Sequence, residues 1–422
     1  MLRRTLAGAL ALSVAACTVT PAPPPSTPLG APTPATTPTV PARPLTPTPP
    51  APDELVIWLP PRFAPDPDTR GGAVLAQQLA EFEATRGVTV TVRLKVEAGR
   101  GGLLDSLLTA FNVAPEVLPD LIALRRDDLA EASVAGALTA LDGLLLPEVL
   151  TQAYPFAQTM SRVEGRWVGA PFATDARIAV YRSDVYGSAP ARWSDLITGT
   201  VIFPGAEASG LTLLNDYLAL DGPLANDNGQ PALNVPLLTS LLTQLSLTRE
   251  ARLLPLATLS YTDTTATGQA FREGRATLAV TSATWYLAEA GRLEQTAAML
   301  PPTLRGRAFT LAEGWCWALV NTGAEDARVA ELANWLTTPS RLAAWTRAAR
   351  VLPPRADVLA AWGDDSFAPL AAAVLTSAEL QPPRATLEQL GPLLAQALDD
   401  VLNNRATPEA AARAVAQSYG QP

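Results

Sequence analysis

The chain reads Glu54-Leu-Val-Ile-Trp58, then Val88-Thr-Val-Thr-Val92, and then Asp120-Leu-Ile-Ala-Leu124. The first and third runs are continuously apolar, which is typical of strands buried on both faces. The second alternates apolar and polar residues with a period of two, which predicts a strand over 88–96. These three runs predict the first strands of one sheet.

Helical spacing separates the three runs. Leu75, Leu79 and Phe82 recur at i, i+4 and i+7, which predicts an amphipathic helix over 72–86 ended by Gly87. A second helix is expected over 103–111. Strand and helix therefore alternate, which predicts an α/β layer with a parallel sheet and a ligand crevice beyond the carboxyl ends of its strands.

The composition excludes several classes of protein. The 422 residues contain 31 Lys+Arg against 40 Asp+Glu, no His, two Cys and 40 Pro. A net charge of −9 without a basic block argues against nucleic acid as a partner. The absence of His removes catalytic triads and His-ligated metal sites, and two Cys cannot build a disulfide framework. The length predicts two domains or lobes.

The N-terminus has the pattern of a secretory signal. Arg3 and Arg4 precede a short apolar run, and small residues precede Cys17. The run is too short to span a bilayer. This end resembles a bacterial lipobox, which implies that residues 1–16 are removed and that Cys17 becomes the lipidated first residue. The alternative is an ordinary secreted protein with an incidental Cys.

A proline-rich tether follows, over residues 17–52. Fourteen of the 32 residues from 21 to 52 are Pro, interleaved with Thr, Ala and Ser, and the segment has almost no charge. Such a composition cannot bury enough apolar surface to fold, and it favours extended polyproline II. A ligand for an SH3-type domain is the alternative, but the neighbouring lipidation signal favours a spacer.

The folded part resembles the family 1 extracellular solute-binding proteins, the sugar-binding components of ABC importers, which are related to maltose-binding protein. Ten segments carry the resemblance in the order and at the spacing of the family. They are Glu54-Leu-Val-Ile-Trp58, residues 80–92, Pro119-Asp-Leu-Ile122, Gly136-Ala-Leu-Thr-Ala-Leu-Asp142, Gly165-Arg-Trp-Val-Gly-Ala-Pro171, Ala179-Val-Tyr-Arg-Ser-Asp184, Trp193-Ser-Asp-Leu196, Phe271-Arg-Glu-Gly-Arg-Ala276, Leu332-Ala-Asn-Trp-Leu336 and Val351-Leu-Pro-Pro-Arg355.

The resemblance implies an α/β, two-lobed, periplasmic-binding-protein-like (type II) fold with a hinge of several crossings and a ligand cleft between the lobes. Lobe 1 would comprise 53–170 and 303–350, and lobe 2 would comprise 171–302 and 351–422. The crossings are expected near Pro171, Pro301-Pro302 and Pro353-Pro354, because proline fixes φ and stiffens a segment. Alternatively, these prolines simply mark loop entries.

Four of the nine Trp residues are candidates for stacking on a sugar ring. Trp58 lies near the carboxyl end of the first strand, and Trp315 lies just ahead of a strand expected at 318–320, beside a Gly that would let the chain approach a ligand. The resemblance places Trp285 in the loop that carries the family's main stacking residue, and Trp362 in a late region of lobe 2. Core packing is the alternative for each.

Four polar residues complete the candidate ligand-binding set. The resemblance places Asp175 where relatives carry a ligand-binding carboxylate; the alternative is a solvated Asp at the hinge. Asp127 follows the third strand, where helix capping would explain it equally well. Arg62 and Glu207 lie in loops expected to face the cleft, although Arg62 could simply be exposed.

We therefore expect a lipid-anchored, monomeric binding protein that captures a mono- or oligosaccharide and delivers it to ABC permease subunits, without catalysis, cofactor or metal. The turn Asn226-Asp-Asn-Gly229 lacks the first Asp of a calcium loop, and Cys316 is expected to be a small buried residue. Two alternatives remain open: a glycosidase, since carboxylate pairs act without His, and an adhesin or sensor lipoprotein on the same scaffold.

Overall fold

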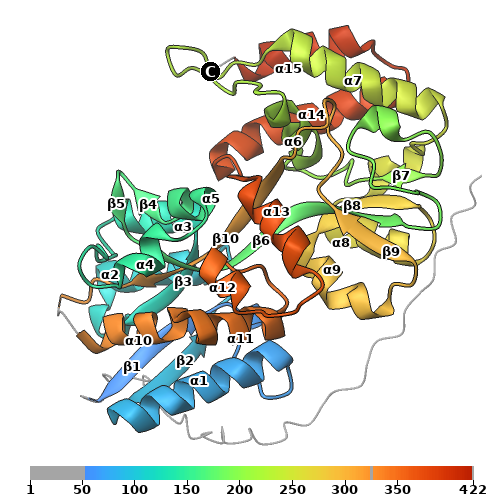
Figure 1. Ribbon diagram of the computed structural model, residues 1–422. Helices are drawn as coiled ribbons and strands as arrows, with labels where there is room; N and C mark the ends of the chain where they lie inside the picture. The colour runs from blue at the N-terminus through green and yellow to red at the C-terminus, as the bar shows by residue number, and fades with distance from the viewer. Residues whose placement is uncertain (1–52, 324–326, 421–422) are drawn as a thin grey trace, which may run out of the picture. The chain divides into compact units, whose positions relative to one another are not determined.

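The computed structural model describes residues 53–323 and 327–420 (Figure 1). The predicted signal peptide, Cys17 and the predicted tether lie outside these residues. Within the described ranges, no helix is both long and apolar enough to cross a membrane.

The first strands form the parallel sheet that the sequence predicts. Strands β1 (Glu54–Leu59), β2 (Thr89–Leu94) and β3 (Leu121–Arg125) pair in the order β2-β1-β3, with β1 parallel to both neighbours. Four of the five residues of β3 are buried, as expected for a strand covered on both faces.

The predicted helices of this lobe form where expected. Helix α1 (Arg70–Arg86) ends at Gly87, whose φ of 68° is the left-handed conformation that glycine adopts without strain. It packs on α10 (Ala327–Thr337) and α11 (Pro339–Ala349), while α2 (Leu103–Val113) packs on α3 (Arg126–Val134) (Figure 1). The smaller elements of lobe 1 are α4 (Pro147–Thr151), α5 (Pro155–Met160) and the hairpin of β4 (Arg162–Val163) and β5 (Arg166–Trp167).

Two long antiparallel strands join the lobes. In β6 (Ala170–Arg182), the residues up to Ala176 pair with β10 (Thr310–Leu319), and those from Arg177 pair with β8 (Leu278–Ser282). In β10, the first residues pair with β11 (Ala378–Leu380) and the last with β3. The sheet order β2-β1-β3-β10-β6-β8-β7 therefore runs through both lobes.

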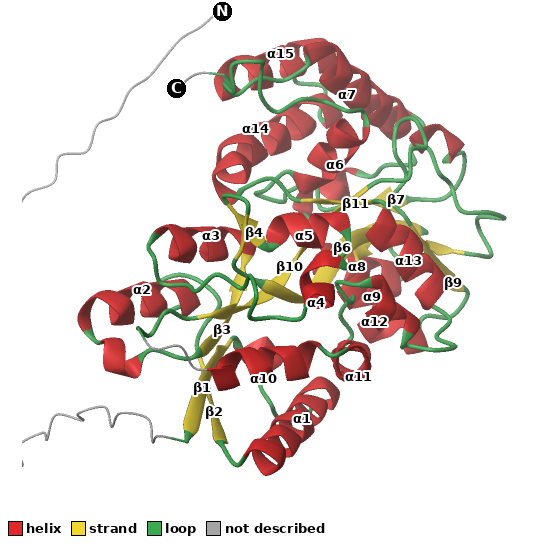
Figure 2. Cartoon of the chain, turned by 60° about the vertical axis from the view of Figure 1, so that its left-hand side comes forward, coloured by secondary structure: helices red, strands yellow, loops and turns green. Residues whose placement is uncertain are grey.

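Lobe 2 is a sheet covered on both faces. Ile178 and Val180 of β6 belong to the core cluster that continues into lobe 1, whereas Ala179 faces a second cluster. Helices α8 and α9 lie on the first face, and α6, α7, α14 and α15 gather on the other (Figure 2). The bounds of these and the remaining elements are β7 (Val201–Ile202), α6 (Leu211–Ala219), α7 (Val235–Glu250), α8 (Thr264–Arg272), α9 (Ala283–Glu289), β9 (Thr296–Met299), α12 (Ala356–Ala360), α13 (Ala368–Thr376), α14 (Arg384–Leu402) and α15 (Pro408–Tyr419).

Strand β6 changes partners a few residues after Pro171, whereas β10 changes partners about ten residues after Pro301-Pro302. Pro171 is still paired with Cys316 within lobe 1, beside the bulge left by Phe172, and β6 changes partners at 175–177. The second crossing lies at 311–314 rather than near Pro301-Pro302. The third begins at Leu352, which bridges Thr174, and ends at β11.

Helix α6 carries buried polar residues beneath the hinge. The Thr212 hydroxyl accepts a hydrogen bond from Arg177 of β6, and the Asn215 amide oxygen accepts one from the backbone N–H of Leu311 of β10. Both oxygens of Asp216 lie 3.1–3.2 Å from the indole nitrogen of Trp193, which donates to them. Burial raises the pKa of Asp216 to about 8, although the N–H donors of Trp193 and Leu304 oppose the shift.

This raised pKa predicts an unusual dependence of stability on pH. Because the folded chain holds the Asp216 proton more tightly than the unfolded chain, the stability from this group is complete below about pH 4 and is lost as the pH rises through about 8. Asp216→Asn keeps an acceptor for Trp193 without a titrating group. We expect the variant to exceed the native chain by at least about 1 kcal/mol at pH ~9 in urea unfolding. A native chain as stable as the variant at pH ~9 would contradict this account.

Candidate ligand-binding site

Two adjoining cavities open where the lobes meet, and Asp175 and Glu313 line both of them. We call them together the junction site. The larger has a volume of about 310 Å³ and the smaller of about 20 Å³. The polar and aromatic residues that line the junction site are Arg62, Phe63, Thr174, Asp175, Arg177, Glu207, Ser209, Thr264, Ser282, Thr284, Glu313, Trp315 and Gln381.

Asp175 lies at the point where β6 passes between the lobes. Its Oδ1 accepts hydrogen bonds from the backbone N–H groups of Ala176 (2.9 Å) and Thr284 (3.0 Å), so the carboxylate is held from both β6 and α9. Burial and the nearby charge of Glu313 raise the pKa of Asp175, while the two backbone donors lower it. Within residues 53–323 and 327–420, Asp175 has no ion-pair partner.

The other two carboxylates of the junction site are paired with guanidinium groups. Glu313 accepts from Arg125 at 2.9 Å, and Glu207 forms a short ion pair with the buried Arg177. Nε of Arg177 and Oε2 of Glu207 are buried without a hydrogen-bond partner, so each retains bonding capacity. Arg62 also lines the site, and its guanidinium lies 3.9 Å from the carboxylate of Glu97, outside the site. Three cationic and three anionic side chains therefore lie at the site itself, and their formal charges cancel.

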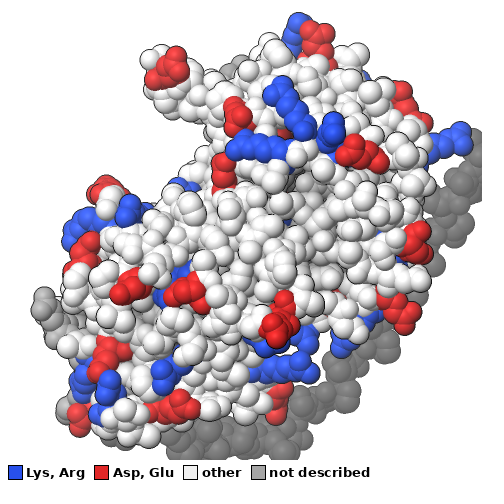
Figure 3. Space-filling model, viewed as in Figure 1, with Lys and Arg blue, Asp and Glu red and all other residues white. Residues whose placement is uncertain are grey.

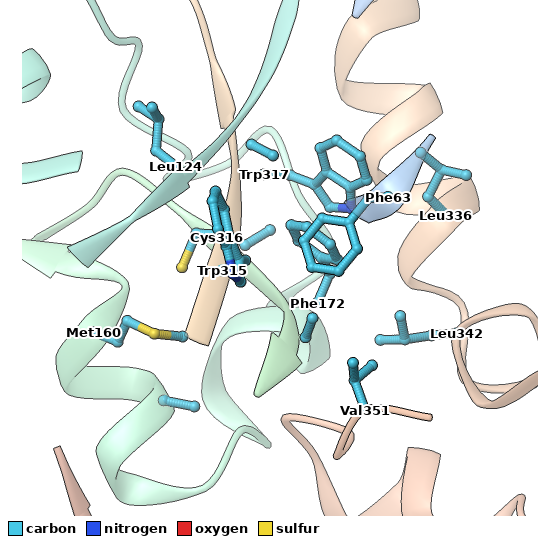
Figure 4. Packing of buried hydrophobic residues seen from close by; sticks show 14 of the residues in the cluster. Phe63, Leu124, Met160, Phe172, Trp315, Cys316, Trp317, Leu336, Leu342 and Val351 are labelled. Atoms are coloured by element: carbon cyan, nitrogen blue, oxygen red, sulfur yellow. The ribbon is translucent and has the colours of Figure 1, made fainter. Parts of the chain in front are cut away.

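An aromatic wall closes the lobe 1 side. The rings of Trp315 and Phe63 meet edge to face with centroids 5.5 Å apart, and Phe172 stacks on Trp317 at 4.3 Å (Figure 4). Trp315 lies inside β10, not ahead of a strand as predicted. A Cβ on Gly314 would lie 2.5 Å from the Ala173 carbonyl oxygen, so this glycine allows the two hinge strands to approach each other rather than a ligand to approach the chain.

Three of the predicted stacking residues lie outside the junction site, where the core-packing alternative applies. Trp58 is buried in β1 beneath Lys95, whose Nζ lies 4.7 Å from the centre of its ring. Trp362 is buried against α11 and donates its indole N–H to the Thr346 hydroxyl at 3.1 Å. Trp285 is buried, and its ring packs against Gly268 of α8. The contact is so close that a Cβ on Gly268 would lie 2.4 Å from the ring.

Asp127 lies outside the junction site, at a contact between the two lobes. Its Oδ2 accepts the backbone N–H of Arg384, the first residue of α14, at 3.0 Å. The capping alternative is therefore the one found, but the capped helix is α14 in the other lobe and not α3. Of the eight predicted ligand-binding residues, the junction site brings together Arg62, Asp175, Glu207 and Trp315.

Arg177 and Glu313 were not predicted, although the sequence contains a signal for both. Alternate residues of a strand share one face, so Arg177 shares a face with Asp175, and Glu313 with Trp315. Applying a period of two to Asp175 and Trp315 would have found both, had these residues been expected to lie in strands.

No other part of the described chain suggests a different chemistry. Residues 53–323 and 327–420 contain no group of three or more His, Cys, Asp or Glu that could hold a metal ion. The Asn226–Gly229 segment forms the predicted turn, with the Gly229 N–H donating to the Asn226 carbonyl. Cys316 is buried as predicted, and burial raises the pKa of its thiol to about 12. On the face drawn in Figure 3, acidic and basic side chains are mixed and form no basic stripe.

The family comparison agrees with this architecture. The profile of a family described as bacterial extracellular solute-binding protein matches residues 77–400. The chain belongs to this family. Extracellular solute-binding proteins act outside the cytoplasm, and the two-lobed α/β fold with a site between the lobes is consistent with membership. No curated protein sequence matches the chain.

Solved structures of solute-binding proteins share the fold at low sequence identity. The sugar-binding protein MalE from Xanthomonas citri matches with a TM-score of 0.70 and 17% identity, covering 87% of this chain and 96% of that one. The cyclic alpha-maltosyl-1,6-maltose binding protein from Arthrobacter globiformis has a TM-score of 0.69 and 16% identity, covering 88% and 98%. A cyclo/maltodextrin-binding protein complexed with maltotetraose has a TM-score of 0.69 and 19% identity, covering 87% and 97%. These solute-binding proteins therefore establish the type II fold.

The position of Trp285 predicts a structural phenotype. Trp285→Ala should lower the free energy of unfolding by about 3 kcal/mol, because a large buried side chain is lost. Gly268→Ala should also destabilise, because its methyl group meets the Trp285 ring. In the double variant, the new methyl group occupies part of the vacated space, so its loss should be smaller than the sum of the two single losses. Urea unfolding of all four chains measures these differences.

The reverse pattern would contradict this assignment. If Trp285→Ala kept full stability and the double variant were strictly additive, the ring would not pack on α8, and a ligand-facing position would have to be reconsidered.

Proposed function

We propose that this protein is the carbohydrate-binding component of an ABC importer, held at the outer face of the membrane by a lipid on Cys17. It captures a neutral mono- or oligosaccharide in the junction site by closure of the two lobes and delivers it to the permease subunits. The observation that carries the proposal is the junction site itself: a charge-balanced polar lining beside an aromatic wall, at the hinge of a two-lobed fold.

The charge balance favours a neutral ligand rich in hydroxyl groups. A hydroxyl both donates and accepts, so it can satisfy the free Oε2 of Glu207 and Nε of Arg177 without leaving a charge unpaired. An anionic or cationic ligand would instead disturb the balance between the three positive and the three negative side chains. The volume of about 310 Å³ lies at the lower end of the range for small-molecule sites.

The relatives support a saccharide within that class. Structures that share the fold include proteins described as binding maltotetraose, maltose and acarbose. Trp315, which lines the smaller cavity, places an aromatic side chain beside the larger one, as expected next to a bound sugar ring. Asp175, held by two backbone donors, supplies a fixed acceptor for ligand hydroxyls.

Binding measurements with maltotetraose and acarbose test the proposal. We expect saturable changes in Trp fluorescence, and Asp175→Asn should weaken binding about tenfold or more, because a hydrogen bond to a charged group contributes about 1.5–3 kcal/mol. The melting temperature should not fall, because the substitution removes a buried charge beside Glu313 while keeping an acceptor for both backbone donors. Asp184→Asn, at an exposed position just after β6, is the matched control and should bind like the native chain.

If neither these saccharides nor a panel of monosaccharides and polyols changed the fluorescence or the melting temperature of the native chain, the saccharide class would be wrong.

A second candidate function rests on one observation. Asp175 and Glu313 are direct cross-strand partners, and the raised pKa of Asp175 is a property of general acids in glycosidases. A glycosidase would release new reducing ends from maltotetraose over hours at stoichiometric protein, and Glu313→Gln would abolish the release. A binding protein would return the saccharide unchanged.

The lipid anchor predicts a separate result. In bacterial cells fed an alkyne fatty acid, the native chain should take up the label and remain with the membrane fraction, whereas Cys17→Ser should do neither. Because Cys316 is buried, Cys316→Ser serves as the control and should be labelled normally. An equally labelled Cys17→Ser chain would remove the anchor from the proposal.

A further inference from the structure

The N-terminus of α14 lacks a cap from its own lobe. Its N-cap residue is Pro383, which has no side chain able to accept a hydrogen bond, and the sequence supplies no acidic residue in the first turn. The body of the helix is anchored in the core of lobe 2 through residues such as Leu390, Leu394 and Leu398. The partial positive charge at the N-terminus of α14 therefore points out of lobe 2, and no side chain of the preceding segment or the first turn neutralises it.

Lobe 1 supplies the missing partners. Helix α3 is anchored in the core of lobe 1 through Leu129 and Ala132, and its first turn contacts the start of α14. The Asp127 carboxylate accepts the Arg384 backbone N–H, and the Asp128 carboxylate pairs with the Arg384 guanidinium. The side chain of Asp128 is only 6% exposed, whereas that of Arg384 is 47% exposed.

The contact between α3 and the first turn of α14 lies between two cavities. Asp128 and Arg384 line an outer cavity of about 540 Å³ beside α2, whereas Leu387, one helical turn along α14, lines the junction site. The first turn of α14 thus stands between the junction site and the outside. Because the outer cavity is open to water, the ion pair can separate and hydrate when the lobes part.

We propose that Asp127, Asp128 and Arg384 form an interlobe latch that favours the closed arrangement of the lobes, so that ligand affinity depends on residues that do not contact the ligand. This inference depends on the proposed function, because it assumes that the two lobes open and close. The bond from Asp127 to the N-terminus of α14 and the ion pair of Asp128 with Arg384 can both form only when α3 and α14 are in contact. The apparent affinity falls in proportion to the fraction of molecules able to close, so loss of the latch weakens binding without altering the site.

The test measures the separation of the lobes without any ligand. Spin labels are placed by Val134→Cys in lobe 1 and Ile197→Cys in lobe 2, in the full chain carrying Cys17→Ser. The native residues at these two positions are 75% and 84% exposed. The buried Cys316, with its pKa raised to about 12, does not compete for the label. Asp128→Asn and Arg384→Gln should each shift the distance distribution toward longer values, and the double variant should add little, because both break the same pair.

Glu131→Gln is the matched control. Glu131 lies on the same helix, lines the same outer cavity and undergoes the same change of charge, but it forms no bond to α14 within the described residues. Its distance distribution should match that of the native chain. High salt should lengthen the distance in the native chain and have little further effect on Asp128→Asn.

Maltotetraose binding supplies the second measurement. Asp128→Asn and Arg384→Gln should weaken it about tenfold, which corresponds to about 1.4 kcal/mol, while Glu131→Gln should not. If both latch variants gave the same distance distributions as Glu131→Gln, the latch would be wrong. That outcome is independent of saccharide binding, because the distances are measured without ligand, so the proposed function would stand or fall on its own titrations.

Discussion

Two strands, β6 and β10, run side by side through the point where the lobes meet, and Asp175 stands opposite Glu313 there. Each strand has partners from lobe 1 along one part of its length and partners from lobe 2 along the other, so this pair is shared by both halves of the sheet. The absence of a side chain at Gly314 permits the close approach of the strands. Because the hinge and the binding site are built from the same residues, any rotation about these strands also moves the groups that line the site.

Placing three carboxylates around one site is electrostatically costly, and the structure offsets this by pairing. Arg125 neutralises Glu313 and Arg177 neutralises Glu207, whereas Asp175 is held by backbone N–H groups from two different elements. The Arg177–Glu207 pair is buried, whereas the Arg125–Glu313 pair is partly exposed. A buried ion pair contributes little net stability, but it fixes the positions of its donors and acceptors. The result is a polar lining whose formal charges cancel and whose donors and acceptors are held by neighbouring groups.

The sequence predicted the polar half of the site better than the aromatic half. The family resemblance placed Asp175, and Glu207 was expected in a loop that faces the cleft. Trp58, Trp285 and Trp362 could not be assigned in the same way. Whether an indole faces a cavity or a core depends on its neighbours in space, such as Gly268 beneath Trp285 and Thr346 beside Trp362, which lie 17 and 16 residues away.

Local pattern by itself determined the alternation of strands and helices, the glycine end of α1 and the turn at Asn226–Gly229, because each depends on residues close together in the chain. The alternation in turn indicated a parallel sheet. Only the tertiary structure decided that Asp127 caps a helix 257 residues away, that Glu313 faces Asp175, and that Gly314 serves strand contact. Those facts depend on the register between β6 and β10 and on the meeting of two lobes. A register or an interlobe contact is a property of pairs of distant segments, and no single segment carries it.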